Sequence, residues 1–218
     1  MSRKRNSTAM QNTIVSRIIT RLQSVEKSLH SLTSEVKSLR SDLEQLQEDD
    51  VCDAQPTKKA HCDFVRESGF VVVFTDGACE NNGKKNARAG IGVWFDDNHP
   101  LNLSQPVNGR ATNNTAEIQA CIQAVKTAHA NGVTKLKIKT DSEFVINSMT
   151  KWIFKWRINN WKVATGGDVK NKEDFVTLDN TLKLMEKVIW EHVDAHKGIQ
   201  GNEAADTLAK AGALLYKP

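Results

Sequence analysis

The sequence lacks the features of several large classes of protein. No run of apolar residues is long enough to cross a membrane, and the N-terminus lacks the apolar core of a secretory signal. The four cysteines show neither a C-x-x-C spacing nor the pattern of a zinc site. These absences favour a soluble protein of a reducing, intracellular compartment that makes no membrane contact.

A strong overall charge is also missing. The 218 residues carry a net charge of +4, with 39% hydrophobic and 26% charged residues, which is ordinary for a globular protein. A global charge this small does not by itself indicate nucleic-acid binding. The length suffices for one substantial core plus an appendage.

Residues 1–13 are polar and contain the basic run Arg3-Lys4-Arg5. We predict a disordered tail here. The alternatives are a nuclear targeting signal and, because no acidic residue occurs before Glu26, a weak mitochondrial presequence. The sequence thus leaves the location open between nucleus, mitochondrion and cytoplasm.

Residues 14–47 carry apolar residues at alternating spacings of three and four, with no Gly or Pro, which predicts a coiled-coil helix. In a parallel pair Arg21 would face Glu26, and Glu35 would face Arg40. We therefore predict a homodimer through this segment. The pattern does not separate a dimer from a trimer or a hetero-oligomer, and packing on the chain's own second domain is the alternative. The repeat consists of Val15, Ile18, Leu22, Val25, Leu29, Leu32, Val36, Leu39, Leu43 and Leu46.

Residues 48–69 lack periodicity and predict a linker, whereas residues 70–216 predict a compact α/β domain. Hairpin-ordered strands followed by alternating helices and strands predict a five-stranded mixed sheet with helices on both faces. Lysines alternate with apolar residues along 136–140, so we expect their face of the strand to contact water. The expected strands are Phe70–Phe74, Ala89–Phe95, Leu101–Val107, Leu136–Thr140 and Val188–Val193, and the expected helices are Thr115–Ala130, Glu143–Trp152, Phe175–Lys187 and Asn202–Leu215.

Asp76 follows the apolar run Val71–Phe74, which predicts a strand buried on both faces. We expect the strand to end at Asp76, and Gly77 to let the backbone turn and approach a ligand closely. Ligands of α/β sheets bind at this end of the strands. A lone Asp there is more often a turn residue, so the prediction depends on what accompanies it.

Three further carboxylates occur in similar settings. Asp141 ends the strand at 136–140, Glu117 lies in the first turn of a helix with small residues on one face, and Asp206 lies one turn into the last helix. Brought together, four carboxylates would repel each other unless cations neutralise them. Oxygen ligands without a Cys or His pattern suit Mg²⁺ or Mn²⁺, and paired ions of this kind serve displacement at phosphorus.

Five sequence blocks resemble type 1 ribonuclease H, in the family's order and spacing, over about residues 70–215. The resemblance implies a ribonuclease H-like α/β fold. It also implies an endonuclease that hydrolyses the RNA strand of RNA·DNA hybrids and leaves 5′-phosphate ends. The blocks are Thr75-Asp76-Gly77, Thr112–Glu117, Thr140-Asp141-Ser142, His192–His196 and Gly201–Asp206.

The resemblance further assigns catalytic roles. Two Mg²⁺ ions, with Mn²⁺ as a substitute, would activate the attacking water and stabilise the leaving oxygen. His196 would assist proton transfer or product release, although the family usually has Pro-Gly where this chain has Asp194-Ala195. The metal ligands would be Asp76, Glu117, Asp141 and Asp206.

Contacts to both substrate strands follow from the same resemblance. Short amides suit the 2′-hydroxyl of RNA, and a forked Arg side chain suits a DNA phosphate. The basic, aromatic stretch 151–157 resembles the family's protrusion, which binds a backbone without base contacts and so implies little sequence preference. The RNA strand would contact Asn82, Asn113, Asn114 and Glu117, and the DNA strand would contact Arg110, Thr112, Asn171, Trp152 and Trp156.

Two other functions compete with this interpretation. A DNA-directed nuclease or transposase could use the same fold, but the block at 112–117 and the protrusion argue against it. A non-catalytic hybrid-binding or scaffolding protein would rely on the coiled coil. Residues 1–50 contain no Phe, Trp or Tyr, unlike the aromatic hybrid-binding domain of many eukaryotic members. We expect the coiled coil to take that domain's place and to provide avidity.

Overall fold

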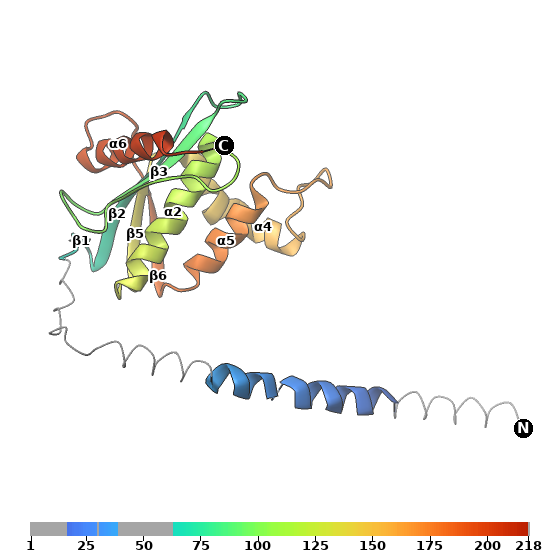
Figure 1. Cartoon of the computed structure of the whole chain (residues 1–218). Helices are drawn as coiled ribbons and strands as arrows, with labels where there is room; N and C mark the ends of the chain where they lie inside the picture. The colour runs from blue at the N-terminus through green and yellow to red at the C-terminus, as the bar shows by residue number, and fades with distance from the viewer. Residues whose placement is uncertain (1–16, 30, 39–62, 218) are drawn as a thin grey trace, which may run out of the picture. The chain divides into compact units, whose positions relative to one another are not determined.

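The computed structural model describes residues 17–29, 31–38 and 63–217 (Figure 1). The chain forms two separate units, Met1–Ala60 and His61–Pro218. The predicted tail at 1–13 and most of the predicted linker lie outside the described residues, as do four positions of the heptad repeat: Val15, Leu39, Leu43 and Leu46.

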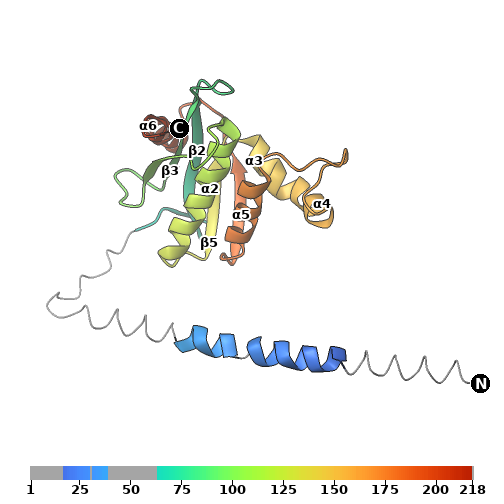
Figure 2. The ribbon, with the colours of Figure 1, turned by 45° about the vertical axis from the view of Figure 1, so that its right-hand side comes forward.

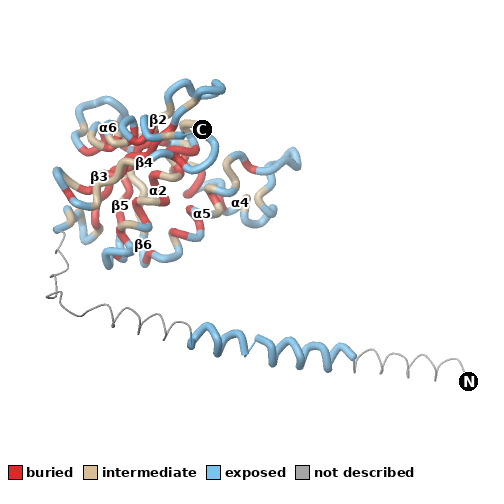
Figure 3. Tube along the Cα trace, in the orientation of Figure 1, coloured by how far each residue is buried: buried red, intermediate tan, exposed pale blue. Residues whose placement is uncertain are grey.

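The first unit is helical at residues 17–29 and 31–38, and it is exposed along its described length (Figure 3). The apolar side chains of the heptad repeat there are 46–67% exposed, with Val36 and Leu29 at the two extremes. Helix formation is thus confirmed in these residues, while pairing of the helix stays a prediction. None of the helices in the described part of the chain is both long and apolar enough to cross a membrane.

The second unit contains the α/β domain. Its elements in chain order are β1 (Arg66–Glu67), β2 (Phe70–Glu80), β3 (Arg88–Trp94), β4 (Leu103–Pro106), α2 (Asn113–Ala130), β5 (Lys135–Thr140), α3 (Glu143–Asn147), the π-helical η1 (Ser148–Trp152), α4 (Ile153–Ile158), α5 (Lys172–Leu182), β6 (Lys187–His192) and α6 (Gln200–Leu214).

The strands of the described residues form one six-stranded mixed sheet in the order β4-β3-β2-β5-β6, with β1 pairing with β2 off this path. The predicted mixed sheet is confirmed, with β1 as a strand beyond the five expected. Strands β2, β3 and β4 are antiparallel neighbours, whereas β5 and β6 run parallel to β2. Helices α2 and α5 lie side by side on one face of the sheet, and α6 covers the other face (Figure 2). The expected helices on both faces are therefore confirmed.

Strand β2 is buried on both faces, also as predicted. Val71 and Val73 pack in the core under α2, and Val72 and Phe74 pack in a second cluster with Ala205 of α6. An apolar residue at every position from Phe70 to Phe74 suits a location between two layers of helix.

The folded unit begins earlier than the predicted boundary at residue 70. Strand β1 pairs with β2 through the two-residue turn Ser68-Gly69. Both turn residues have positive φ, 50° and 84°, which is the geometry favoured for tight hairpins. The prediction of a linker up to residue 69 is wrong in this part, because two residues are too few to show a strand pattern.

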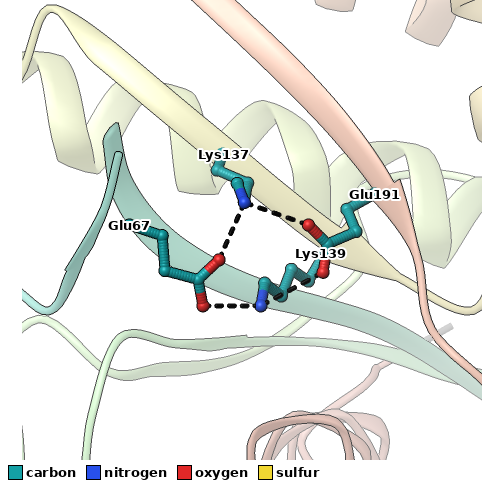
Figure 4. Close-up of polar contacts among 4 residues, drawn as sticks. All are labelled: Glu67, Lys137, Lys139 and Glu191. Carbon is teal, nitrogen blue, oxygen red and sulfur yellow. Dashed lines mark hydrogen bonds and ion pairs between the residues drawn. The ribbon is translucent and has the colours of Figure 1, made fainter. Parts of the chain in front are cut away.

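The lysine side chains of β5 form ion pairs instead of simply facing solvent. Lys137 and Lys139 each contact Glu67 of β1 at 2.7 Å and Glu191 of β6 at 3.1 Å (Figure 4). Their side chains are only 16% and 13% exposed. The network ties β1, β5 and β6 together, and the expected solvent-facing lysines are corrected to ion-paired ones.

Several helix ends also differ from the prediction. The helix predicted to end at Trp152 continues through the π-helical turn into α4 and ends at Ile158. Helix α5 begins three residues before the predicted Phe175 and ends at Leu182 rather than Lys187. The backbone N–H groups of Glu186 and Lys187 instead donate to the Thr134 carbonyl oxygen. Strand β2 continues to Glu80, six residues beyond the predicted end at Phe74. The remaining boundaries differ by the few residues usual for helix and strand ends.

Candidate active site

Asp76 and Asp141 lie at the same level of two neighbouring parallel strands. The pairing of β2 with β5 ends at Phe74↔Lys139, and counting two residues onward along each chain reaches Asp76 and Asp141. Asp141 follows the last residue of β5, as predicted. Asp76 does not end its strand, because β2 continues to pair with β3 through Asp76↔Gly92 and beyond. The sheet thus splits at this point, and the two carboxylates lie where β5 stops.

Gly77 brings Glu117 to this point. A Cβ atom on Gly77 would lie 2.5 Å from the backbone carbon and 2.7 Å from the Cβ of Ala116, so only glycine lets α2 pack this closely on β2. The expected turn at Gly77 is wrong, since the residue lies within the strand and contacts a helix. Gly77 still lines the pocket that holds the carboxylates, so the expected approach of a ligand stays a prediction. Glu117 lies just past the first turn, because α2 begins at Asn113.

A second glycine brings Asp206 to the site from the other face. A Cβ atom on Gly92 would lie 2.6 Å from the backbone nitrogen of Ala209, so helix α6 packs directly on β3. Asp206 is the seventh residue of α6, rather than one turn into it. Its carboxylate accepts a hydrogen bond from Lys210 Nζ at 2.6 Å, one helical turn further along.

The four carboxylates line one pocket with a volume of about 640 Å³. His196 and Lys210 lie in the same pocket, together with Asn113. The sequence-predicted catalytic residues are therefore brought together by elements from four parts of the chain: Asp76 from β2, Glu117 from α2, Asp141 after β5 and Asp206 from α6.

The pocket concentrates negative charge. Burial, and then the charges of Asp141, Asp206 and Glu117, raise the pKa of Asp76 to about 7, although its carboxylate accepts a hydrogen bond from the backbone N–H of Gly77. Burial likewise raises the pKa of Glu117. A cation would remove this repulsion, and an all-carboxylate donor set fits a hard divalent ion.

The carboxylates are also engaged by neighbouring side chains. In the described residues no three Asp, Glu, His or Cys side chains converge into a ready metal cluster. Glu117 accepts hydrogen bonds from Ser142 Oγ and, at 2.7 Å, from Asn113 Nδ2. A cation would therefore have to compete with these donors, as it would with Lys210 at Asp206.

Sequence reasoning gave no role to three of these supporting residues. Asn202 is 2% exposed, and its Nδ2 donates to Asp141 Oδ2 at 3.0 Å. Ser142 binds Glu117, and Lys210 binds Asp206. Helical spacing could have indicated two of them, because Asn202 and Lys210 lie four residues before and after Asp206, on the same side of α6.

His196 lies in the loop between β6 and α6. Its backbone has a positive φ of 52°, and its side chain is exposed at the pocket. The loop is held at its far end, where the Gly198 N–H donates to Glu203 Oε1 at 3.1 Å. The imidazole can thus reach the carboxylate site from a segment anchored to the first turn of α6.

Two of the predicted RNA-strand residues, Asn113 and Glu117, line the pocket, and the other two lie beside Asn113 in space or in sequence. Asn82 Oδ1 lies 3.4 Å from the backbone nitrogen of Asn113, which donates to it, and Asn113 binds Glu117 in turn. Asn114 is exposed on the next residue of α2. Amide groups therefore extend from the turn after β2 to the carboxylates.

Three of the predicted DNA-strand residues lie at the beginnings of two neighbouring helices. Thr112 caps α2, its hydroxyl accepting from the Thr115 N–H at 3.2 Å, and exposed Arg110 precedes it. Asn171 begins α5 with φ 56° and ψ 33°. The two helices run side by side in the same direction (Figure 2), so their positive N-terminal ends lie at the same end of the domain.

The predicted aromatic pair belongs to a larger array. The rings of Trp152 and Trp156 are 6.0 Å apart, and Trp156 is 6.1 Å from Trp161 and 5.2 Å from Phe175. These contacts join the protrusion to the core, so the expected patch is partly structural. Trp152 remains 41% exposed and is available to a ligand.

Comparison with curated proteins finds close relatives. Ribonuclease H1 of Rattus norvegicus is 49% identical over 143 residues, which are 66% of this chain and 50% of the rat protein. Ribonuclease H1 of Homo sapiens is 47% identical over 144 residues, which are 66% of this chain and 50% of the human protein. Ribonuclease H of Actinobacillus pleuropneumoniae is 40% identical over 145 residues, or 66% of this chain and 90% of the bacterial protein. The chain thus spans about half the length of the mammalian relatives.

Solved structures agree with the fold. A foamy viral protease-reverse transcriptase in complex with dsDNA superposes with a TM-score of 0.56 at 26% identity, over 66% of this chain and 94% of that one. LC9-RNase H1, described as a type 1 RNase H with the type 2 active-site motif, gives 0.52 at 25% identity, over 65% of this chain and 71% of that one. The profile of the RNase H family matches residues 68–214, with all four pocket carboxylates inside the match. This chain belongs to the ribonuclease H family, as a type 1 member.

Proposed function

We propose that this chain is an endoribonuclease that hydrolyses the RNA strand of RNA·DNA hybrids with little sequence preference. The observation that carries the proposal is the pocket itself, in which four carboxylates from separate elements meet beside Asn113, which Asn82 contacts in turn. Relatives named Ribonuclease H and Ribonuclease H1 support it.

The family consists of metal-dependent nucleases. For this chain we propose two Mg²⁺ ions, with Mn²⁺ as a substitute, held by the four pocket carboxylates. When bound, such ions activate the attacking water and stabilise the leaving oxygen. The raised pKa of Asp76 supports the proposal, because burial, and then the neighbouring carboxylates, disfavour its charged form, which a bound cation would stabilise.

On the RNA side, the amides of Asn82, Asn113 and Asn114 would hydrogen-bond the 2′-hydroxyl groups near the cleaved bond. A 2′-hydroxyl both donates and accepts, as an amide does, and DNA lacks it. Asn113 also binds Glu117, so recognition of the RNA sugar and orientation of a catalytic carboxylate are coupled. His196 would exchange a proton with water or the leaving group from its exposed loop.

On the DNA side, Arg110, Thr112 and Asn171 would grip one backbone phosphate at the two helix N-termini. The exposed face of Trp152 and the lysines of the protrusion would contact the same strand. Since these groups meet phosphates rather than base edges, we expect binding that weakens steeply with salt.

For the first unit we propose a parallel homodimer of helices through residues 14–47. The exposed apolar stripe of the described helix supports this, as do the opposite charges of Arg21 and Glu26. Two tethered catalytic units would gain avidity on one hybrid. Sedimentation tests the proposal: Leu22→Asp, within the stripe, should give a monomer, and Ser24→Asp, outside it, should not. A wild-type monomer at micromolar concentration would disprove it.

The activity itself is tested on four labelled duplexes of one sequence: RNA·DNA, RNA·RNA, DNA·DNA, and RNA·DNA with 2′-O-methyl RNA. We expect cleavage of the RNA strand in the first duplex only, dependent on Mg²⁺ and abolished by EDTA. Cleavage of duplex DNA would instead favour a DNA-directed nuclease. Binding of the hybrid without cleavage under Mg²⁺ or Mn²⁺ would favour a non-catalytic hybrid-binding protein.

A further inference from the structure

The 107–112 loop, which joins β4 to α2, carries Arg110 in an exposed stretch without regular secondary structure. Its beginning is fixed, because the Val107 N–H donates to the Ala89 carbonyl oxygen at 3.0 Å. Its end is fixed by Thr112, the cap of α2. The part between these two anchors needs other contacts if Arg110 is to be presented in one place.

Gln119 supplies such a contact from the second turn of α2. Its Oε1 accepts from the Asn108 N–H at 2.9 Å, and its Nε2 donates to the Asn108 carbonyl oxygen, also at 2.9 Å. The side-chain amide thereby pairs with both backbone groups of one loop residue. The remaining hydrogen on Nε2 is donated to Asp174 Oδ1 at 3.0 Å.

Asp174 lies in the first turn of α5, three residues after Asn171. A single side chain therefore connects three segments: the 107–112 loop, helix α2 and the beginning of α5. Both hydrogens and the oxygen of the Gln119 amide are used in this connection.

Tyr216 holds the same loop from the C-terminal end of the chain. Its hydroxyl donates to the Gly109 carbonyl oxygen at 2.8 Å, and its ring packs beside the small apolar cluster that contains Val107 and Ala89. Asn108 and Gly109, the two residues before Arg110, are thus each bound by a distant side chain.

We propose that Gln119 is a positioning residue, supported by Tyr216, that fixes Arg110 and Thr112 relative to Asn171 so that they form one pocket for a DNA phosphate. This inference rests on the proposed function. A pocket shared between a loop and two helices binds well only if its parts are held in register before the ligand arrives, because ordering them at binding costs affinity. Neither Gln119 nor Tyr216 needs to touch the substrate for this role.

The test replaces Gln119 with Met, which keeps the shape of the side chain and removes its hydrogen bonds. With the RNA·DNA hybrid as substrate, we expect KM to rise about tenfold, the scale of two or three lost net hydrogen bonds. We expect kcat to change less than about twofold, because the cleaved bond is on the other strand. Gln123→Met, one turn further along α2, is the matched control, and Tyr216→Phe should raise KM less than Gln119→Met does.

A second readout separates positioning from general loss of stability. Single methylphosphonates placed in turn along the DNA strand remove one phosphate charge at a time. For wild type, KM should peak at one position, where the pocket grips the strand. Gln119→Met should flatten that peak and leave the effects at other positions unchanged.

The outcomes are distinct. If wild type does not cleave the hybrid at all, the proposed function is wrong. If wild type cleaves and shows the peak but Gln119→Met keeps an equal peak, Gln119 does not position the pocket. A lower Tm with an unchanged peak and KM would also overturn the positioning role, since the contact would then be structural only.

Discussion

Replacement of Gly77 by alanine is expected to force helix α2 away from strand β2. The new Cβ would meet the backbone carbon of Ala116 at 2.5 Å and the backbone nitrogen of Glu117, whereas ordinary contacts begin at 3.4 Å. The neighbours are backbone atoms inside a helix, so no side chain can rotate away. A gap of about 1 Å must open, at an expected cost of about 3 kcal/mol, the upper end of the usual range for overpacking.

The same shift should affect the active site. Glu117 moves with α2 while Asp76 stays on β2, and a misplacement of about 1 Å in a catalytic group can lower the rate about 100-fold. The unfolding midpoint should fall by about 6–12 °C for a domain of this size. Thermal unfolding by circular dichroism gives the midpoint, and hybrid cleavage well below it gives kcat.

Gly167→Ala is the matched control. A Cβ on Gly167 would have Val163 Cγ2 as its nearest neighbour, at 3.9 Å, which is an ordinary contact. We expect the stability of this variant within about 0.5 kcal/mol of wild type. The reasoning is refuted if Gly77→Ala unfolds within about 2 °C of wild type, which is less than overpacking predicts, and also keeps the wild-type kcat. Close packing at Gly77 would then not position Glu117.

Three further predictions concern charge. Folding raises the pKa of Asp76 from 3.8 to about 7, so the folded state favours the protonated carboxyl group. Its contribution to the free energy of unfolding is fully present below about pH 4 and is lost as the pH rises through 7. The metal-free protein should therefore have a lower Tm at pH 8 than at pH 5.5, and Asp76→Asn should remove most of this difference; an equal difference in the variant would contradict it. Lys210→Met frees the Asp206 carboxylate and removes a positive charge, so calorimetry should show a few-fold tighter binding of Mg²⁺. Unchanged or weaker binding would count against competition between Lys210 and Mg²⁺ for Asp206. Glu67→Gln breaks the ion pairs with Lys137 and Lys139 and should lower Tm by about 2 °C in low salt, an effect that 1 M NaCl should largely remove.

The main strands and the four carboxylates were predictable because they leave strong local patterns. Val71–Phe74 is apolar at every position, which indicates a strand covered on both faces, and Leu136–Thr140 alternates clearly. The carboxylates lie in blocks specific to one family. Each of these signals is contained in a few consecutive residues, so one sequence suffices to find it.

The errors come from contacts that no local pattern encodes. Strand β2 passes beyond Asp76 because β3 continues to pair with it, and a single strand does not reveal how long its partner is. Gly77 was expected to form a turn, whereas it lies within β2 and its absent side chain admits helix α2. Lys137 and Lys139 of β5 were expected to face water, but their partner Glu67 lies 70 and 72 residues away in a strand of two residues.

The supporting residues of the site were missed for the same reason. Gln119 joins two helices and a loop through an amide whose partners are 11 and 55 residues away. Asn202 and Lys210 are exceptions, because their four-residue spacing from Asp206 can be read from the sequence once the helix is recognised.

The most direct test of two-metal catalysis at the pocket compares wild type with Asp141→Asn on a labelled RNA·DNA hybrid. Asp141 lies level with Asp76 at the split in the sheet, and the amide keeps its size while removing the charge needed to hold a cation. Cleavage is measured by denaturing gel with Mg²⁺, and binding by fluorescence anisotropy in EDTA, where wild type leaves the hybrid intact. We predict that the variant binds the hybrid like wild type and cleaves it at least about 1000-fold more slowly, the scale on which single catalytic groups act. Cleavage by the variant at the wild-type rate would contradict a catalytic role for the carboxylate pocket.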